Sequence, residues 1–437
     1  MSVEYVRAVP HLTTTLTGPL LKIERQLLEQ QMKIETWFRN QWLDTPAPFY
    51  CSVDLRNAGF KLAPVDTNLF PAGFNNLNPA FFPLCSHAVE SAIERICPEA
   101  RKVLLIPENH TRNTFYFESV ATLVEIMTRV GIDVRIGSLL EDVTAPRDIA
   151  LPSGRNIRLE PLKRSGDRVH IDGFSPCMVL LNNDMSNGRL AILENIDQPV
   201  VPAMDLGWSH RLKSDHFAHY REVTREFAEL IDIDPWLIDP MFRQCGEINF
   251  LKREGEECLA FNVDTLLTQI QQKYDEYGVD KKPFVIIKAD AGTYGMGIMT
   301  AHSSAELKEL NRKQRTQMSA SKGGQTITQV IIQEGVYTFE TWGESQQVAE
   351  PVVYMVDHFV VGGFYRVHTT RGDNENLNAP GMYFEPLAFA DSCCNPDPSK
   401  APDANPNRFY AYGVIARLAL AAAAREAAET KKVERTT

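Results

Sequence analysis

The spacing of apolar residues predicts a helix and then a pair of strands near the start of the chain. Between residues 19 and 43 apolar side chains recur at helical intervals, and Pro19 suits the first turn. Residues 49–55 alternate as in a half-buried strand, a turn follows at 57–59, and a second strand begins at Phe60. Residues 64–83 are rich in Pro, Gly and Asn and predict a shaped loop.

Strands and helices alternate from residue 101. Short buried strands are predicted at 102–108, 132–138 and 177–182, with a helix over 114–130 that Gly131 ends. This alternation is typical of a parallel sheet, whose ligands bind at the carboxyl ends of the strands. Polar side chains stand at two such ends, Asn109 with Arg112 and Asn183 with Asp184.

The chain from residue 212 onward also mixes both kinds of element. Helices are predicted over 212–230, 263–277, 303–315 and 409–429, and strands over 283–290, 327–333, 351–357 and 359–367. The stretch 390–408 carries four prolines and predicts a loop. The pattern as a whole is that of an α/β protein of two or three domains.

Composition excludes several classes of function. The chain has 437 residues and 45 Lys and Arg against 56 Asp and Glu, a net charge of −11, so we expect no nucleic-acid surface. No run of 18 apolar residues is present to span a membrane, and the N-terminal segment lacks the pattern of a secretory signal. The eight cysteines lack zinc-site spacing and predict reduced thiols in a cytoplasm. Adjacent Cys393 and Cys394 are interpreted as loop thiols, with a redox pair as the alternative.

The most specific local motif follows the predicted strand at 283–290. The strand ends near Lys288, and the next loop has the spacing GxxGxG at Gly292, Gly295 and Gly297. Glycine amides can approach phosphate oxygens closely, and the lysine adds a positive charge. No GK[ST] follows, so the motif is not a Walker A loop. The motif predicts phosphate binding, with a plain glycine hairpin as the open alternative.

Three later features fit a phosphate site. The strand at 327–333 leads to Glu334 and Gly335, either a hinge for an adenine edge or a plain turn. Arg366 stands in an apolar strand, so its burial requires an anion, either a ligand or a structural carboxylate. Asn376 and Asn378 lie in a polar turn whose amides can hold an anionic group.

The order of these motifs resembles the ATP-grasp carboxylate–amine ligases, particularly glutathione synthetase. With SVDLRNAGFKLAPVDTNLFPAGFNNL and IIKADAGTYGMGIMT, residues 5–430 are similar to the proteobacterial glutamate–cysteine ligase family. The resemblance implies an ATP-grasp-like fold with a Rossmann-like domain, and ATP and Mg²⁺ as cofactors. It also implies ligation of the γ-carboxylate of L-glutamate to L-cysteine through an acyl phosphate, giving γ-glutamylcysteine in the first step of glutathione biosynthesis.

The resemblance also implies roles for the nucleotide-binding residues. Lys288 matches the second of two lysines that contact the nucleotide in such enzymes. Lys213 best matches the first, and Lys252 is the other candidate. Arg366 would contact the transferred phosphoryl group, Glu334 would lie at the adenine hinge, and the three loop glycines would cover the phosphates.

Amino-acid substrates need groups that hold a carboxylate. Arg56 and Arg112 are the candidates for this task, and each is otherwise a surface or loop residue. Asn109, Asn376 and Asn378 are the accompanying candidates for substrate contacts.

The predicted metal ligands depart from the usual ATP-grasp order. That family places an acid on one strand and Glu-x-Asn on the next, after the Asn-rich loop, but here only residues 429–437 follow the Ala-rich helix. The same chemical order occurs earlier, as Asp54, then Asp66 and Asn68, and predicts Mg²⁺ ligands in a circularly permuted fold. Turn residues are the alternative for all three.

The permuted order divides the chain into three parts. Residues 1–95 are predicted to pack a helix and the metal-ligand hairpin on the C-terminal domain, 96–211 to form the Rossmann-like domain, and 212–437 the ATP-grasp domain. Two other functions stay open: an ATP-grasp ligase for a different acid and amine, and a nucleotide-binding protein without ligase activity.

Overall fold

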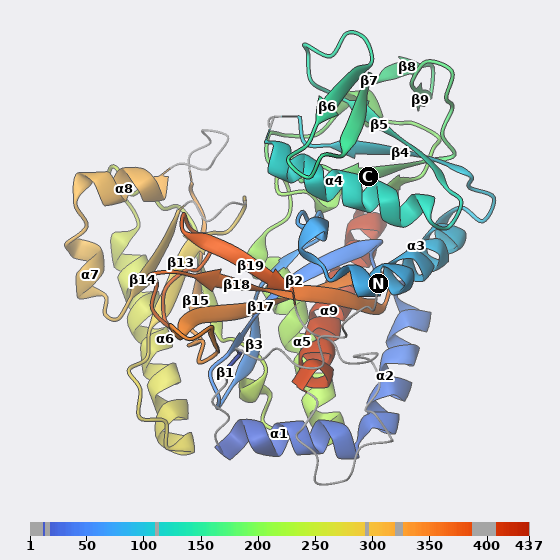
Figure 1. Ribbon diagram of the computed structural model, residues 1–437. Coiled ribbons are helices and arrows are strands. Elements are labelled where there is room, and N and C mark those ends of the chain that lie inside the picture. Colours follow the sequence, from blue (N-terminus) through green and yellow to red (C-terminus); the bar gives the residue numbers. More distant parts are fainter. Residues whose placement is uncertain are drawn as a thin grey trace.

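The computed structural model describes residues 12–13, 18–109, 113–292, 297–319, 327–386 and 408–436. Of the predicted positions, Arg112, Gly295, Cys393 and Cys394 lie outside these residues. Three larger sheets and one separate hairpin organise the described chain (Figure 1). No helix in this part of the chain combines the length and apolar character needed to cross a bilayer.

A six-stranded sheet forms the predicted Rossmann-like unit. Its order is β11-β10-β4-β5-β7-β6, parallel except for the edge strand β6. Alternate residues of the central strands face opposite sides: Val103 and Leu105 pack under α3 (Phe82–Ile96) and α4 (Thr114–Thr128), whereas Leu104 and Ile106 face the rest of the protein. The bounds are β4 (Lys102–Pro107), β5 (Asp133–Ser138), β6 (Arg147–Ala150), β7 (Asn156–Pro161), β10 (Met178–Asn182) and β11 (Val200–Val201), beside the hairpin β8 (Lys163–Ser165) and β9 (Arg168–His170).

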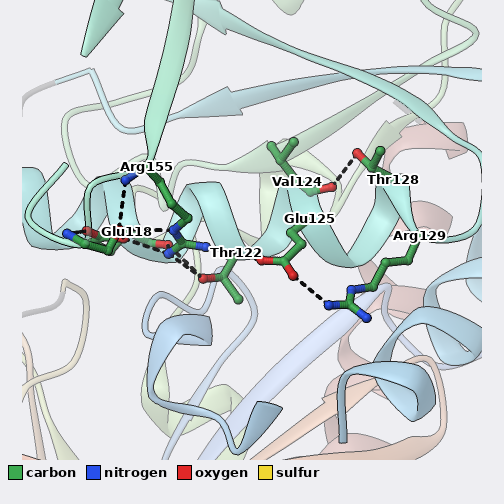
Figure 2. A network of polar contacts seen from close by, with 8 residues as sticks. Glu118, Thr122, Val124, Glu125, Thr128, Arg129 and Arg155 are labelled. Carbon is green, nitrogen blue, oxygen red and sulfur yellow. Dashed lines mark hydrogen bonds and ion pairs between the residues drawn. The ribbon is translucent and has the colours of Figure 1, made fainter. Parts of the chain in front are cut away.

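A polar network fixes the turn between β6 and β7 to α4 (Figure 2). The buried Glu118 carboxylate accepts hydrogen bonds from the amide of Ser153 at 2.7 Å and from its hydroxyl at 2.8 Å. Arg155 pairs with Glu118 at 2.6 Å and donates to Thr122 Oγ1 at 3.1 Å. A buried carboxylate needs such partners, so this network holds the outer strands against the helix.

A four-stranded antiparallel sheet carries the glycine-rich motif. Its order is β12-β15-β13-β14, with bounds β12 (Phe242–Cys245), β13 (Val285–Ala289), β14 (Ile298–Ala301) and β15 (Val330–Glu334). Helices α5 (Lys213–Ile231) and α6 (Glu256–Tyr277) pack against this sheet. The helix expected over 303–315 is two, α7 (Ala305–Lys308) and α8 (Arg312–Ser319), because Asn311 and Gln314 exchange amide-to-side-chain bonds of 2.9 Å and start a new helix.

A seven-stranded antiparallel sheet joins both ends of the chain. It runs β1-β16-β17-β18-β19, while β2 pairs with β17 and β3 with β2, as the permuted order predicts. The face with Val53 and Val353 packs in the same core as α9 (Arg408–Thr436). The bounds are β1 (Leu12–Thr13), β2 (Tyr50–Asn57), β3 (Leu62–Asn68), β16 (Thr341–Trp342), β17 (Gln347–Val356), β18 (Phe359–His368) and β19 (Met382–Pro386).

The helix predicted over 19–43 is bent into two. Helices α1 (Gly18–Glu29) and α2 (Gln31–Asp44) meet at Gln30 and run in different directions (Figure 1). The side chains of Gln26 and Gln30 donate to the carbonyl of Ile231 at 3.4 and 3.0 Å. The bend therefore lets the junction satisfy carbonyls at the C-terminus of α5, which a helix end leaves unpaired.

A buried ion pair ties α9 to the segment before α5. Glu426 accepts from Arg211 Nε at 2.7 Å and Nη2 at 3.1 Å, and its Oε2 lies 3.2 Å from His216 Nδ1. Burial alone would raise the pKa of Glu426, but Arg211 and His216 together lower it to about 2, from an ordinary value of 4.5. The pair therefore stabilises the fold above about pH 4.5 and loses its effect as the pH falls toward 2.

We expect Glu426→Gln to lower the free energy of unfolding by about 2–3 kcal/mol near neutral pH, because Arg211 loses a charged partner. Urea unfolding at several pH values measures this, and the deficit should shrink between pH 4.5 and 2. Glu429→Gln is the control: Glu429 is also on α9 and 3.4 Å from His219, but two-thirds exposed. Equal losses in both variants would contradict the assignment.

Candidate active site

A cavity of about 700 Å³ opens between the three sheets. Residues of β2, β3, β17 and β18 form one wall, residues of β13 and β15 a second, and residues after β4 and β10 a third. Most of the predicted site residues that the structure describes line it: Asp54, Arg56, Asp66, Asn68, Lys213, Lys288, Gly292, Glu334, Arg366, Asn376 and Asn378.

Two buried lysines converge on this cavity. Lys213, the first residue of α5, donates to the carbonyl of Gly292 at 3.0 Å, and its ammonium lies 3.5 Å from the centre of the Trp208 ring. Lys288 on β13 donates to the carbonyl of Val65 at 2.6 Å. Burial lowers the pKa of both, that of Lys288 to about 8, although Asp66 opposes the shift. Both ammonium groups thus lack a fully compensating anion, which a phosphate would supply.

The glycine-rich loop begins beside these lysines. Gly292 has a φ of +97°, a conformation that glycine adopts without strain. Asp290, just before it, is fully buried and accepts from the amide of Ser214 at 2.8 Å, and its carbonyl accepts from the amide of Lys213 at 2.9 Å. The end of β13 and the start of α5 are therefore fixed to each other.

Arginine and carboxylate side chains alternate along the seven-stranded sheet. Arg366 on β18 donates to Asp54 at 2.7 Å and to Glu350 at 2.6 Å, and Glu350 also accepts from Arg56 Nε at 3.0 Å. Arg56 further donates to the carbonyl of Val336 at 3.1 Å. In the described part of the chain, the buried Arg366 Nε has no hydrogen-bond partner. There Arg366 pairs with two carboxylates, and Arg56 is held by one of them, Glu350.

The predicted metal ligands share one part of the wall. Asp54 and Asp66 are opposite each other across β2 and β3, and Asp66 and Asn68 line the cavity two residues apart. Burial alone would raise the pKa of Asp66, but Lys213, Lys288 and Arg211 together lower it to about 2, so it stays ionised. Among the described residues no three His, Cys, Asp or Glu side chains form a metal cluster. These oxygen donors fit a Mg²⁺ ion, which binds one or two carboxylates and takes its remaining oxygen ligands from phosphate groups and water.

The side chain of Glu334 binds other side chains of the protein. Its carboxylate accepts from Lys61 Nζ at 2.7 Å and from Trp236 Nε1 at 3.0 Å, and both ionic groups are almost fully buried. Position 335 requires glycine, because a Cβ atom there would come within 2.1 Å of the Phe284 ring. The Gly335 amide also donates a hydrogen bond to the carbonyl of Phe284 at 2.8 Å. Packing and an ion pair explain this Glu–Gly turn, and the adenine hinge stays a prediction about position only.

Several candidates stand apart from the cavity. Asn109 and Gly297 are described but do not line it. Gly297 instead accepts from the amide of Ala289 at 3.2 Å, which joins the ends of β13 and β14. Lys252 is exposed in a turn and also lies outside the wall, so Lys213 is the better placed of the two candidate first lysines.

Some wall residues have no counterpart among the sequence predictions. Glu350, Trp208, Glu108 and Tyr116 all line the cavity. Period-two alternation through 350, 352 and 354 could have placed Glu350 on the same face as Val352. No comparable signal marks Trp208, which reaches Lys213 only through the packing of the segment before α5.

A second cavity, of about 1090 Å³, lies on the parallel-sheet unit between α4, β5 and β7. None of the predicted site residues with a described position lines it. Its arginines include Arg129, paired with Glu125 at 2.7 Å, and Arg155, held by Glu118 as described above (Figure 2). Both arginines thus belong to the polar network around α4.

Comparisons with known proteins identify what the whole chain is similar to. The family GshA, glutamate-cysteine ligase, matches residues 24–427. The crystal structure of a protein provisionally named gamma-glutamylcysteine synthetase, from Methylobacillus flagellatus KT, is 60% identical, with a TM-score of 0.89 over 97% of this chain and 99% of that one. No curated protein matches the sequence.

Two other structures are far less similar. A glutathione synthetase-like effector from Globodera pallida is 10% identical over 86% of this chain and 85% of that one, with a TM-score of 0.34. D-alanyl-alanine synthetase A from Vibrio cholerae is 9% identical over 72% and 80%, with a TM-score of 0.32. From the match to nearly its whole length, the chain belongs to the glutamate–cysteine ligase family, whose reaction joins glutamate to cysteine in the first step of glutathione synthesis.

Proposed function

We propose that this cavity catalyses the ATP-dependent ligation of L-glutamate to L-cysteine through a γ-glutamyl phosphate. The observation that supports it most is the convergence of Lys213, Lys288 and Arg366 on a space lined by the ionised Asp66 carboxylate and by Asp54, which pairs with Arg366. Phosphoryl transfer depends mainly on positioning and on neutralising charge, and these are the groups that do both.

The residues divide into a nucleotide side and a metal side. Lys213 and Lys288 would bind the ATP phosphates, covered by the loop that begins at Gly292, and Arg366 would contact the transferred phosphoryl group. Asp54, Asp66 and Asn68 would hold Mg²⁺, which when bound supplies positive charge shared between these ligands and the phosphates.

The amino-acid side uses the polar ends of the same wall. Arg56, Asn376 and Asn378 line the cavity and would orient the glutamate carboxylates, while Arg112 and Asn109 stay predictions from the sequence. In the second step the cysteine amine attacks the acyl carbon, a C–N bond forms, the C–O bond to phosphate breaks, and phosphate leaves with the proton that the amine gives up.

Trapping tests the order of these steps. With ATP and glutamate but no cysteine, we expect hydroxylamine to convert the acyl phosphate into the γ-hydroxamate of glutamate, detected by mass. Leaving out glutamate is the control and should give no hydroxamate. A hydroxamate of cysteine in place of the glutamate product would reverse donor and acceptor.

An omission assay separates the proposed reaction from its alternatives. Phosphate release should require both glutamate and cysteine, and the product should have the mass of γ-glutamylcysteine. Release with a different acid or amine indicates another ligase specificity, and ATP binding without release in any mixture indicates a non-catalytic nucleotide-binding protein.

We also propose the three-part division of the chain at residues 96 and 212, with a cytoplasmic setting. Pairing of β2 with β17 supports assigning the first part to the C-terminal domain, because the hairpin carrying Asp54 and Asp66 completes that domain's sheet. A setting that keeps thiols reduced fits an enzyme whose substrate is itself a thiol.

A further inference from the structure

Two cysteines near the nucleotide sheet lie in almost direct contact. Cys245 ends β12 and is buried, whereas Cys258 lies in the first turn of α6 and is exposed. Their sulfur atoms are 3.0 Å apart. Both elements hold them there, because Asn262 Nδ2 donates to Cys258 Sγ at 3.4 Å and Arg243 Nε donates to Asn262 Oδ1 at 2.6 Å. A disulfide bond of about 2.0 Å requires the two atoms to move only about 1 Å closer.

We propose that Cys245 and Cys258 form a reversible disulfide that regulates ATP binding, with a small-molecule disulfide as the oxidant. The exposed Cys258 thiolate attacks one sulfur of R–S–S–R, so that bond breaks and one RS⁻ leaves. Cys245 then gives its proton to solvent and attacks Cys258 Sγ, and the second RS⁻ leaves. Two protein thiols are oxidised to one disulfide, and one small disulfide is reduced to two thiols.

The difference in exposure sets the order of attack. Burial, together with the neighbouring Cys258 thiol, raises the pKa of Cys245 to about 12, so Cys245 is a poor first nucleophile. Cys258 is open to solvent and can meet the oxidant. Once Cys258 carries the mixed disulfide, Cys245 is the nearest nucleophile to its sulfur and acts as the resolving thiol.

The link to ATP binding runs through the residue next to Cys245. Gln244 donates to the Asp290 carboxylate at 2.9 Å, and Asp290 holds the amides of Lys213 and Ser214. A pull of Cys245 toward α6 therefore acts on the contact that places Lys213 beside Gly292. This consequence rests on the proposed function, in which Lys213 binds ATP phosphates. The enzyme consumes a thiol, so the condition that oxidises the pair also depletes its substrate.

Peptide mapping and ATP binding test the proposal on the full chain. After incubation with bis(2-hydroxyethyl) disulfide and non-reducing trypsin digestion, we expect peptides 244–252 and 254–273 to be joined. The Kd for ATP should rise about tenfold, since displacing a positioning group by about 1 Å has effects of this size or more. Dithiothreitol should separate the peptides and restore the Kd.

Matched variants identify the responsible thiols. Cys258→Ser should abolish the linked peptides and the change in Kd, while Cys97→Ser and the double variant Cys393→Ser/Cys394→Ser should retain both. Linkage to other cysteines, a mixed disulfide that persists at Cys258, or a Kd unchanged by the disulfide overturns the proposal. These measurements need no ligation, so a protein that binds ATP but forms no γ-glutamylcysteine defeats only the proposed function.

Discussion

Replacing Lys288 by methionine is expected to lower kcat/KM for ATP by about 100–1000-fold, the usual cost of losing one well-placed charged group in an active site. The ammonium is buried at the end of β13, and among the residues that the structure describes its hydrogen-bond partner is the carbonyl of Val65. Methionine keeps the length and apolar stem of the side chain, so the sheet should fold. Initial rates over a range of ATP concentrations, with glutamate and cysteine saturating, measure the effect.

Lys252→Met is the matched control for that variant. It makes the same substitution at the lysine that the sequence offered as the alternative to Lys213, in an exposed turn outside the cavity wall. We expect its ATP dependence to be unchanged. A folded Lys288→Met enzyme with the wild-type ATP requirement would remove Lys288 from the nucleotide site.

Alternation of residue types made the seven-stranded sheet partly predictable. In β2, Val53 and Leu55 are buried toward the core with α9, while Asp54 and Arg56 face the cavity, and this period of two is visible in the sequence. The same sheet continues through β3 as far as Asn68. Its polar cavity-facing residues make it resemble a loop, so the loop predicted from residue 64 begins too early.

Short strands and strands at a sheet edge were harder to predict from the sequence. Strand β12 has four residues, and only Cys245 among them is buried, so it lacks an apolar signature. Helix α3 directly follows a segment rich in Pro and Asn, and these residues indicate a loop, so the sequence analysis did not predict the helix. Conversely, long apolar strands such as β18 were placed correctly, because buried central strands carry the strongest signal.

The sequence indicated which residues belong to the site, but not which side chains they contact. The sequence leaves open whether Arg366 meets a ligand or a carboxylate, and the fold answers with Asp54 and Glu350. Asp54 and Arg366 are 312 positions apart, and they meet because β2 and β18 flank β17. A contact between residues so far apart in the sequence depends on the strand order of the whole sheet. The sequence indicated that order only through the permuted order of the motifs.

The metal assignment makes the last strong prediction. Asp66→Asn is expected to reduce turnover by about 1000-fold at ordinary Mg²⁺ concentrations, since it removes a charged ligand from the ion that neutralises the phosphates. Raising Mg²⁺ should recover part of the rate if Asp54 and Asn68 still bind the ion. A titration of rate against Mg²⁺ at fixed ATP therefore shows a midpoint shifted to higher concentration.

Stability and a matched variant separate a ligand role from a structural one. The side chain of Asp66 is 41% exposed, and its nearest cation is Lys213, 3.6 Å away. Thermal unfolding without ATP should therefore show a loss far smaller than the loss of turnover, because solvent partly screens the attraction of Lys213 and Lys288 that lowers the pKa of Asp66. Asp172→Asn makes the same change in a lysine ion pair, that with Lys163 at 2.6 Å, on the distant β8–β9 side of the molecule, and should leave the Mg²⁺ titration unchanged. If Asp66→Asn titrates with Mg²⁺ like the wild type, the carboxylate is not a ligand, and the permuted hairpin supplies structure without the metal site.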